Sequence, residues 1–315
     1  MSAGRALLLR LGLAPVAVLA VVLLAVVLPE LTGVDAARTV LATRYADGDP
    51  DPAVLAALRE QLGTDLPWPQ RLGERLGALL HGDLGTSWVS GVPVGAIVGP
   101  AAQISLSIVL ASAAASFAVG YAGGLLAARR PGSLADRVIS ALVRVFSAVP
   151  EFAVAPVLVL VFAVGLRLLP VSGWNGPVHA VLPLLSLVPS LAVPIAAVTR
   201  EQAAELRTEN FATAARARGL PERRIWAVHL SRPALPAALS LLTYNAAGAI
   251  AGTTAIEVVF DIPGLGSAVV EAVRAQDVPV VQAGLVLTAV GALLVGAVGD
   301  VLATVADPRT RAVRG

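Results

Sequence analysis

The feature that most constrains the fold is a set of long apolar stretches separated by small groups of charged residues. No Asp, Glu, Lys or Arg occurs from Ala101 to Ala128, or from Leu168 to Thr199. Hydrophobic residues make up 57% of the 315 residues and charged residues only 14%, which is more apolar than a soluble domain. A helix needs about 20 apolar residues to cross a bilayer. The sequence therefore predicts an all-α, multi-span membrane protein.

Six stretches are predicted to span the membrane. They are Ala6–Leu31, Ala101–Ala128, Ile139–Leu166, Val178–Val198, Ala234–Val258 and Val280–Ala303. The apolar part of a signal peptide is shorter, at about 7–15 residues, so we expect the first span to be retained. Pro150 breaks the third span, and the fourth contains Pro183, Pro189 and Pro194, which spans tolerate where neighbouring helices satisfy the freed carbonyls.

The charges of the short connections predict the orientation. The connection after the second span and the tail 306–315 are rich in Arg, whereas Glu257, Asp261, Glu271 and Asp277 surround Arg274 before the last span. Arg-rich short loops stay in the cytoplasm. We expect a multi-pass protein of the plasma or inner membrane with both termini cytoplasmic, divided into span 1–31, an outer segment 32–100, a core 101–305 with the other predicted spans, and the tail.

The outer segment is predicted to hold two short helices. One begins at Pro52 after Asp51, a position that suits Pro because its missing amide hydrogen is not needed there, and the other covers Pro69–Leu80. Their partly apolar faces favour a small cap on the outer side of the membrane. The alternative is a solvated loop without a role.

A polar stretch from Arg200 to Pro236 interrupts the apolar pattern with seven Arg and four Glu. We expect one helix over Glu201–Arg218, a left-handed Gly219 at its end, and a second helix over Pro221–Leu230 that Ser231-Arg232-Pro233 stops. Two short helices hinged at a glycine would form a knob on the cytoplasmic face. The alternative is an amphipathic surface helix bound to lipid headgroups.

Part of this stretch, ATAARARGLPERR, resembles the EAA loop of permease subunits of ATP-binding-cassette importers. Ala214-Ala215, three further residues and Gly219 match the core of that motif, whereas Thr213 takes the place of its frequent Glu and His229 that of a later Ile. Other segments resemble the first permease subunit of the dipeptide/oligopeptide/nickel transport family, in family order from Leu55 to Arg311. They are ALREQLGTDLPWPQRL, GDLGTSWVSGVPV, LPVSGW, VVFDIPGLGSAVVEAVRAQDVPVVQ and DPRTR. Pro29-Glu30-Leu31 stands where that family has Pro-Gly-Asp-Pro.

The resemblance implies a type I importer permease (MetI-like) fold with six transmembrane helices that forms half of a pore. Its implied partners are a second homologous permease, two cytoplasmic ATPase subunits and an extracytoplasmic substrate-binding protein. The substrates would be di- or oligopeptides, or a related solute such as nickel or a metal chelate. The sequence has no GxxxxGK[ST] motif, so ATP and Mg²⁺ would be bound by the partner ATPases and this chain would be a non-catalytic subunit.

Matching the loop residue by residue gives candidate ATPase-coupling residues. Phe211, Ala214, Ala215 and Gly219 are expected to make contacts or set the geometry, and charged residues to form a rim. The full set is Phe211, Thr213, Ala214, Ala215, Arg216, Arg218, Gly219, Leu220, Pro221 and Glu222.

Polar residues within the predicted spans are candidates for the translocation path. They are Glu151, Tyr244, Asn245, Thr253 and Thr254. Ionisable residues inside a membrane are costly and often functional. The alternatives are hydrogen bonding between helices for the residues of the fifth span, and pairing with an Arg or a wet cytoplasmic mouth for Glu151.

Several other function classes are disfavoured. There is no Cys, and His81, His179 and His229 are scattered without an HExxH pair, which argues against a metal site. A net charge of only +2 and Arg positions that follow the topology argue against nucleic acid. An ATP-independent channel or secondary transporter stays open, although no internal repeat supports the latter. The lack of a GxSxG motif disfavours an intramembrane hydrolase.

Overall fold

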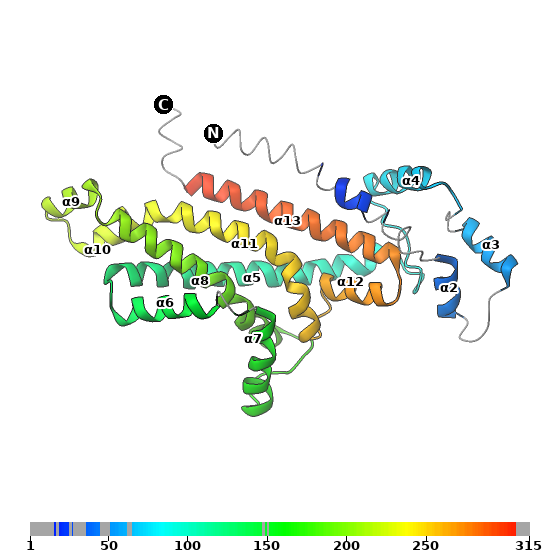
Figure 1. Cartoon of the computed structure of the whole chain (residues 1–315), viewed down its shortest axis with the longest axis horizontal. Coiled ribbons are helices and arrows are strands. Elements are labelled where there is room, and N and C mark those ends of the chain that lie inside the picture. Colours follow the sequence, from blue (N-terminus) through cyan, green and yellow to red (C-terminus); the bar gives the residue numbers. More distant parts are fainter. Residues whose placement is uncertain are drawn as a thin grey trace. The chain divides into compact units, whose positions relative to one another are not determined.

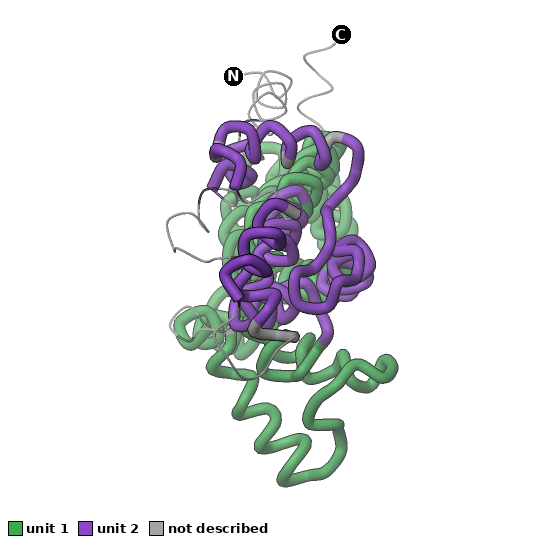
Figure 2. The backbone as a smooth tube through the Cα atoms, turned by 90° about the vertical axis from the view of Figure 1, so that its right-hand side faces the viewer, with its two compact units in different colours: residues 1–9, 106–262, 291–315 green, residues 10–105, 263–290 purple. Residues whose placement is uncertain are grey.

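The computed structural model describes residues 16, 19–24, 27, 36–44, 51–61, 65–146, 149 and 151–306. This described chain is mostly helical, and Thr86 and Pro93 form an isolated β-bridge. The chain divides into two compact units, coloured separately in Figure 2. Unit 1 contains Met1–Leu9, Leu106–Ile262 and Gly291–Gly315, and unit 2 contains Arg10–Ser105 and Pro263–Val290.

Among the described residues, four helical stretches are long and apolar enough to cross a membrane. They are Val94–Arg129, Pro177–Leu206, Glu222–Val259 and Val278–Ala306. These contain the predicted second, fourth, fifth and sixth spans. The predicted first span lies largely outside the described residues, so the count of six stays a prediction.

The predicted third span, Ile139–Leu166, is not one helix. α6 (Leu134–Phe146) ends before Pro150, and α7 (Glu151–Leu158) begins after it and continues into the π-helical η1 (Val159–Gly165). α6 carries Asp136, Arg137 and Arg144 among its apolar residues, which suits the surface of a membrane better than its interior. The apolar part after the break is shorter than a full span.

Unit 1 is built on close contact between α5 (Val94–Arg129) and α8 (Val181–Leu206), which follows the short 3₁₀ helix η2 (Pro177–Ala180). A Cβ on Gly124 would lie 2.5 Å from the carbonyl oxygen of Ala196, and one on Gly120 would overlap the carbonyl of Ala192. Glycines four residues apart therefore let the two backbones meet. α11 (Ser231–Val259) packs along α8, as do α6 and α7 (Figure 1).

Small residues also line the contacts of α11. Ala234, Ala238 and Ala246 are buried, and such small side chains let helix backbones approach closely. Within unit 1, Gly299 of α13 (Val278–Ala306) faces Thr243 so closely that a Cβ on the glycine would overlap the threonine side chain.

Unit 2 contains the two short helices predicted for the outer segment. α3 (Pro52–Gln61) is capped by Asp51, whose Oδ1 accepts a hydrogen bond of 2.9 Å from the Ala53 N–H, and α4 covers Trp68–Leu80. α2 (Ala36–Arg44), which the sequence did not predict, packs on α3 through Ala37, Leu41 and Leu55.

The rest of unit 2 joins two segments that are far apart in sequence. Buried Asp277, which follows α12 (Leu265–Arg274), accepts hydrogen bonds from the Ser87 hydroxyl and, at 3.1 Å, from the Trp88 N–H. Ser105 Oγ accepts a bond of 2.7 Å from the Leu265 N–H. A buried cluster spans both segments and includes Val94, Val98, Leu265, Ala272, Val280 and Ala283.

Candidate functional site

The charged stretch folds differently from the two predicted helices. The first expected helix, Glu201–Arg218, is two: α8 runs on to Leu206, Glu209 is extended (ψ 152°), and α9 covers Asn210–Ala217. The second expected helix does not stop at Ser231-Arg232-Pro233. α10 (Glu222–Arg224), the π-helical η3 (Ile225–Leu230) and α11 form one helical stretch from Glu222 to Val259.

The π-helical turns of η3 lead directly into α11, and Pro233 lies in the first turn of α11. Proline has no N–H, so the carbonyl four residues earlier loses its usual partner. The widened π turns change the backbone register just before Pro233, and the Ser231 hydroxyl donates to the Ala227 carbonyl at 2.7 Å. The Tyr121 hydroxyl of α5 also donates to the Ser231 carbonyl at 2.5 Å. A side chain of the same helix and one of a neighbouring helix therefore donate to two backbone carbonyls close to Pro233, those of Ala227 and Ser231.

Gly219 ends α9 in the left-handed conformation that the sequence predicted, with φ +75°. Its N–H donates to the Arg216 carbonyl at 2.9 Å, and the Leu220 N–H reaches back to the Ala215 carbonyl at 3.2 Å. These two bonds form a Schellman motif. Leu220 is half-buried against the cluster that contains Ala215, which is the apolar contact that accompanies this motif.

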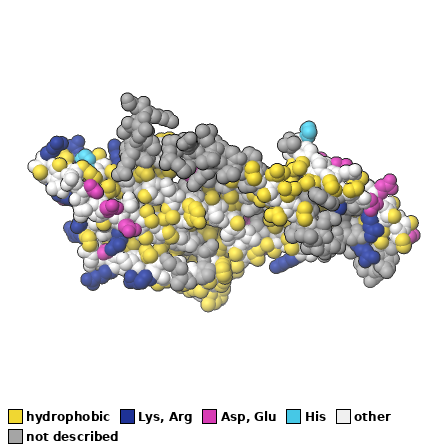
Figure 3. Space-filling view, turned by 45° about the horizontal axis from the view of Figure 1, so that its top comes forward, with side chains coloured by type: hydrophobic (Ala, Val, Ile, Leu, Met, Phe, Trp, Pro, Cys, Tyr) yellow, Lys and Arg dark blue, Asp and Glu magenta, His cyan; other side chains and the backbone are white. Residues whose placement is uncertain are grey.

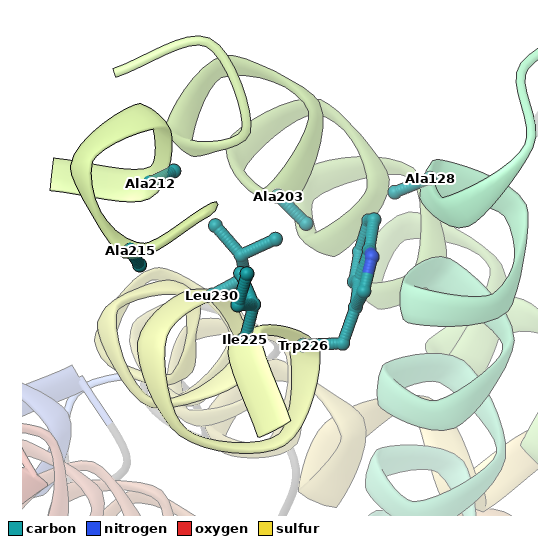
Figure 4. Packing of buried hydrophobic residues seen from close by; sticks show 7 residues of the cluster. All are labelled: Ala128, Ala203, Ala212, Ala215, Ile225, Trp226 and Leu230. Atoms are coloured by element: carbon teal, nitrogen blue, oxygen red, sulfur yellow. The ribbon is translucent and has the colours of Figure 1, made fainter. Parts of the chain in front are cut away.

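A buried cluster holds α9 against the helices around it. Figure 4 shows Ala212 and Ala215 of α9 facing Ile225 and Leu230, while the Trp226 ring stands near Ala203 of α8 and Ala128 of α5. The cluster members are Ala128, Ala203, Ala212, Ala215, Ile225, Trp226 and Leu230. We call α9, α10 and the turns that join them to α8 and η3 the knob (residues 207–224). The cluster fixes the knob to α5, α8 and the start of the α11 stretch.

Two polar contacts of Arg216 connect different parts of the knob. Arg216 Nε lies 2.7 Å from Glu222 Oε1, and Arg216 Nη1 donates to the Arg207 carbonyl at 3.1 Å. The ion pair is part-exposed, so it contributes about 0.2–1 kcal/mol at most. Its effect is to hold α9 near α10 and near the end of α8.

The predicted coupling residues fall into an exposed and a buried group. Phe211 is 42% exposed and Ala215 only 7%. Leu220 is half-buried, as is Arg216, and the others are exposed: Thr213, Ala214, Arg218, Gly219, Pro221 and Glu222. The structure brings all of them into the knob. Their role in contacting an ATPase stays a prediction.

Sequence reasoning missed Ala212 and Trp226, which carry much of the knob's packing. Ala212 is fully buried and Trp226 is 7% exposed. The signal for Ala212 was its spacing of three residues from Ala215, which places both on one helix face. No sequence signal joined Trp226 to Ala128, because that contact depends on the tertiary fold.

Two of the residues predicted for a translocation path, Tyr244 and Thr253, lie on opposite faces of one helix, and the role of the whole set stays a prediction. Tyr244 is 79% exposed, whereas Thr253 is 1% exposed and its hydroxyl donates to the Ile250 carbonyl at 3.0 Å. Nine residues of helix at about 100° each place these two side chains on opposite faces of α11. Asn245 and Thr254 are half-buried on the same helix, and Glu151 begins α7 with its side chain outside the described residues.

An ion pair connects the start of the charged stretch to α6. Arg200 Nε lies 2.5 Å from Asp136 Oδ1, and the Gly132 N–H donates to Asp136 Oδ2 at 2.7 Å. The hydrogen bond from Arg200, and then that from Gly132, lower the pKa of Asp136 below its usual 3.8. Asp136 therefore stays ionised and fixes α6 to α8.

Within the described part of the chain, no group of three or more His, Asp or Glu side chains lies close enough together to hold a metal ion.

Two of the four acidic residues counted in the orientation argument, Glu257 and Asp277, are buried. They contribute to the interior of the protein rather than to the charge of an outer surface.

Comparison with known proteins identifies the family. Residues 120–312 match the family described as the binding-protein-dependent transport system inner membrane component. The chain belongs to this family of transport permeases. The matched region contains the close α5–α8 contact, the knob and α11.

Curated members of this permease family align along most of the chain. A probable peptide ABC transporter permease of Sinorhizobium fredii is 30% identical over 86% of this chain and 92% of its own length. The oligopeptide transport system permease OppB of Salmonella typhimurium is 32% identical over 85% and 91%. The glutathione transport system permease GsiC of Pectobacterium atrosepticum is 31% identical over 96% of both chains. The chain is therefore the membrane permease component of a transport system.

Proposed function

We propose that this chain is one of two permease subunits of an ATP-driven importer of di- or oligopeptides, and that the knob couples it to an ATPase subunit. The observation that carries the proposal is how the knob is fixed. It is held by a buried cluster, a Schellman motif and an ion pair, and it presents Phe211, Thr213 and Ala214 outward. A rigid projection with an exposed face suits a docking element.

The knob lies between two membrane-length helices, which supports a mechanical role. α8 leads into it, and the helical stretch that begins at Glu222 leads out. Because Trp226 packs between α8 and α5, movement of the knob would displace three helices together. Closure of an ATPase would then be converted into rigid-body motion of spans. ATP and Mg²⁺ would be bound by that partner, since this sequence has no P-loop.

Peptides are the favoured substrate class because relatives that align along most of the chain are named for peptide, oligopeptide and glutathione transport. Nickel or a chelate has no such support. The proposed assembly contains a second homologous permease, two cytoplasmic ATPases and an extracytoplasmic binding protein. The Arg-rich knob and both termini would face the cytoplasm.

Site-specific cross-linking of the assembled importer tests the coupling role. The chain has no Cys, so a single introduced thiol reports one position. Thr213→Cys, on the exposed face of α9, is expected to cross-link to the ATPase subunit. Ala212→Cys is its matched control because the neighbouring Ala212 is fully buried. A complex that hydrolyses ATP but gives no cross-link from position 213 would contradict the proposal.

A further inference from the structure

A polar hollow on unit 1 gathers Arg side chains from several elements. It has a volume of about 780 Å³ and is lined by Arg129, Arg130, Arg207, Thr208, Arg216, Glu222, Arg223 and Trp226. Figure 3 shows basic side chains gathered around the end of unit 1 that carries α9. Glu222, the one carboxylate among the lining residues, is already paired with Arg216. The hollow therefore carries an excess of positive charge.

Most of these guanidinium groups have no acidic partner in the part of the chain that the structure describes. Among the described residues, no carboxylate lies within ion-pair distance of the four arginines Arg129, Arg130, Arg207 and Arg223. Like charges held close together repel, so an anion in the hollow would stabilise the arrangement. The planar guanidinium group binds two phosphate oxygens at once, which makes a phosphate group the anion that this lining fits.

A second, mostly apolar groove adjoins the hollow. It has a volume of about 410 Å³ and is lined by Tyr121, Ala122, Leu125, Leu126, Arg129, Trp226, Ala227 and Ser231. Arg129 and Trp226 belong to both cavities. The Arg129 Cζ atom lies 5.7 Å from the centre of the Trp226 ring, a cation–π contact that holds the guanidinium at the boundary.

The two cavities also match the expected position of the membrane. Arg129 ends one helix of membrane-spanning length and Glu222 begins another. Tyr121 precedes Arg129 by eight residues, about 12 Å along the helix axis. The polar hollow thus lies at the ends of two spans, where headgroups are expected, and the apolar groove runs from there along the spans themselves.

We propose that unit 1 binds an anionic phospholipid here, with its phosphate headgroup in the polar hollow and an acyl chain in the adjoining groove. Basic pockets between membrane helices bind anionic headgroups. An acidic protein segment would use the charge but not the apolar groove. The inference needs only a chain placed in a membrane and does not rest on coupling to an ATPase. A bound lipid would connect α5 to the knob.

Binding of phosphatidylglycerol to the purified, delipidated protein, followed by native mass spectrometry, tests the proposal. Phosphatidylglycerol is expected to bind saturably and at least about tenfold more tightly than phosphatidylcholine. Each neutralised Arg should weaken binding about fivefold, so Arg129→Gln with Arg223→Gln should weaken it about 25-fold. Arg224→Gln is the matched control, because Arg224 is an exposed neighbour of Arg223 that does not line the hollow.

Ala122→Trp separates a lipid from a free phosphate. It should obstruct the apolar groove without changing charge, so phosphatidylglycerol binding should fall while binding of inorganic phosphate is unchanged. Inorganic phosphate binding as tightly as the lipid, with no effect of Ala122→Trp, would overturn the proposal in favour of a free-anion site.

Two further outcomes would overturn it. One is wild-type affinity for phosphatidylglycerol in the Arg variants. The other is that the Arg variants keep lipid binding but lose an acidic protein that co-purifies with the wild type. That result would make the hollow a protein interface. If the double variant does not fold, Arg223→Gln alone provides the test, because its position is exposed. It should bind phosphatidylglycerol about fivefold more weakly than wild type.

Discussion

At the scale of single residues, two adjacent alanines that both match the EAA-like motif differ in burial. Ala214 and Ala215 both match the core of the EAA-like loop, yet Ala214 is exposed and Ala215 lies on the buried face of α9. Successive residues of a helix differ by about 100° in direction, so adjacent positions cannot share one face. The motif located the knob, but the surrounding fold decided which of its side chains point outward.

Gly219 gives the sharpest prediction at this scale. Gly219→Pro would fix φ near about −65° where the backbone has +75°, and would remove the N–H donated to the Arg216 carbonyl. We expect loss of uptake and of substrate-stimulated ATP hydrolysis in the reconstituted importer, with membrane insertion intact. Gly219→Asn, which tolerates the left-handed region, should stay within about threefold of wild type. Normal transport by Gly219→Pro would contradict the coupling role.

Asp136 predicts a pH dependence of stability. Its pKa is lowered below 3.8, chiefly by Arg200, so its stabilising contribution is complete above that pH and is lost as the pH falls through the folded-state pKa. Asp136→Asn should lower the Tm of the purified protein at neutral pH, and the difference from wild type should shrink below about pH 3.8. Glu201→Gln, at an exposed position, is the control. A pH-independent difference would show that the charge is not responsible.

At the scale of elements, the contact between α5 and α8 depends on backbone approach. A Cβ at position 124 would lie 2.5 Å from the Ala196 carbonyl oxygen and 2.7 Å from the Thr199 Cβ, so Gly124→Ala should destabilise the protein by about 1–3 kcal/mol. Gly123→Ala is the matched control, since its Cβ would meet only the Ile139 side chain at 3.4 Å. Thermal unfolding in detergent compares them, and equal Tm values would refute the packing argument.

The contact of Asp277 with the segment around Ser87 in unit 2 gives a second prediction at this scale. Asp277→Ala would leave the Ser87 hydroxyl and the Trp88 N–H without their acceptor, and a lost buried partner costs about 1–3 kcal/mol. We expect a lower Tm and faster proteolysis of the segment around Ser87. The control is Glu271→Ala, at an exposed position of α12, which should behave as wild type.

Helix ends were the least predictable elements. Apolar runs correctly located α5, α8, α11 and α13, because bilayer thickness demands a minimum length that any sequence must satisfy. Pro233 was wrongly read as a stop, because no sequence signal indicated the π-helical turns of Ile225–Leu230 that lead directly into α11. The third span was predicted as one broken helix, and the structure separates it into α6 and α7.

At the scale of the whole molecule, the membrane orientation is open to a direct test. Thr213→Cys and Ser90→Cys each place one exposed thiol in a chain without Cys. An impermeant maleimide applied to intact cells is expected to label position 90 only, and to label position 213 after the membrane is opened. Labelling of position 213 in intact cells would reverse the predicted topology, in which Arg-rich segments face the cytoplasm.

The sequence predicted the class of molecule better than its internal contacts. Composition and apolar runs indicated a helical membrane protein, and the motifs indicated the permease family that the comparisons confirm. The pairing of Ser87 with Asp277, 190 residues apart, had no sequence signal, because long-range contacts depend on topology rather than on local pattern. By contrast, the opposite faces of Tyr244 and Thr253 follow from their spacing in one helix, and a residue-by-residue count along the span would have separated them.

The unbroken helix from Glu222 to Val259 has a consequence for how force would travel. Its 38 residues correspond to about 57 Å of helix axis, and helical residues continue from the knob into α11. Under the coupling proposed above, a load applied at the Glu222 end would pass through the π-helical turns of Ile225–Leu230 before it reaches Pro233. The pivot of this helix would be the Trp226–Ala128 contact, so a small tilt at one end becomes a larger sweep at the other.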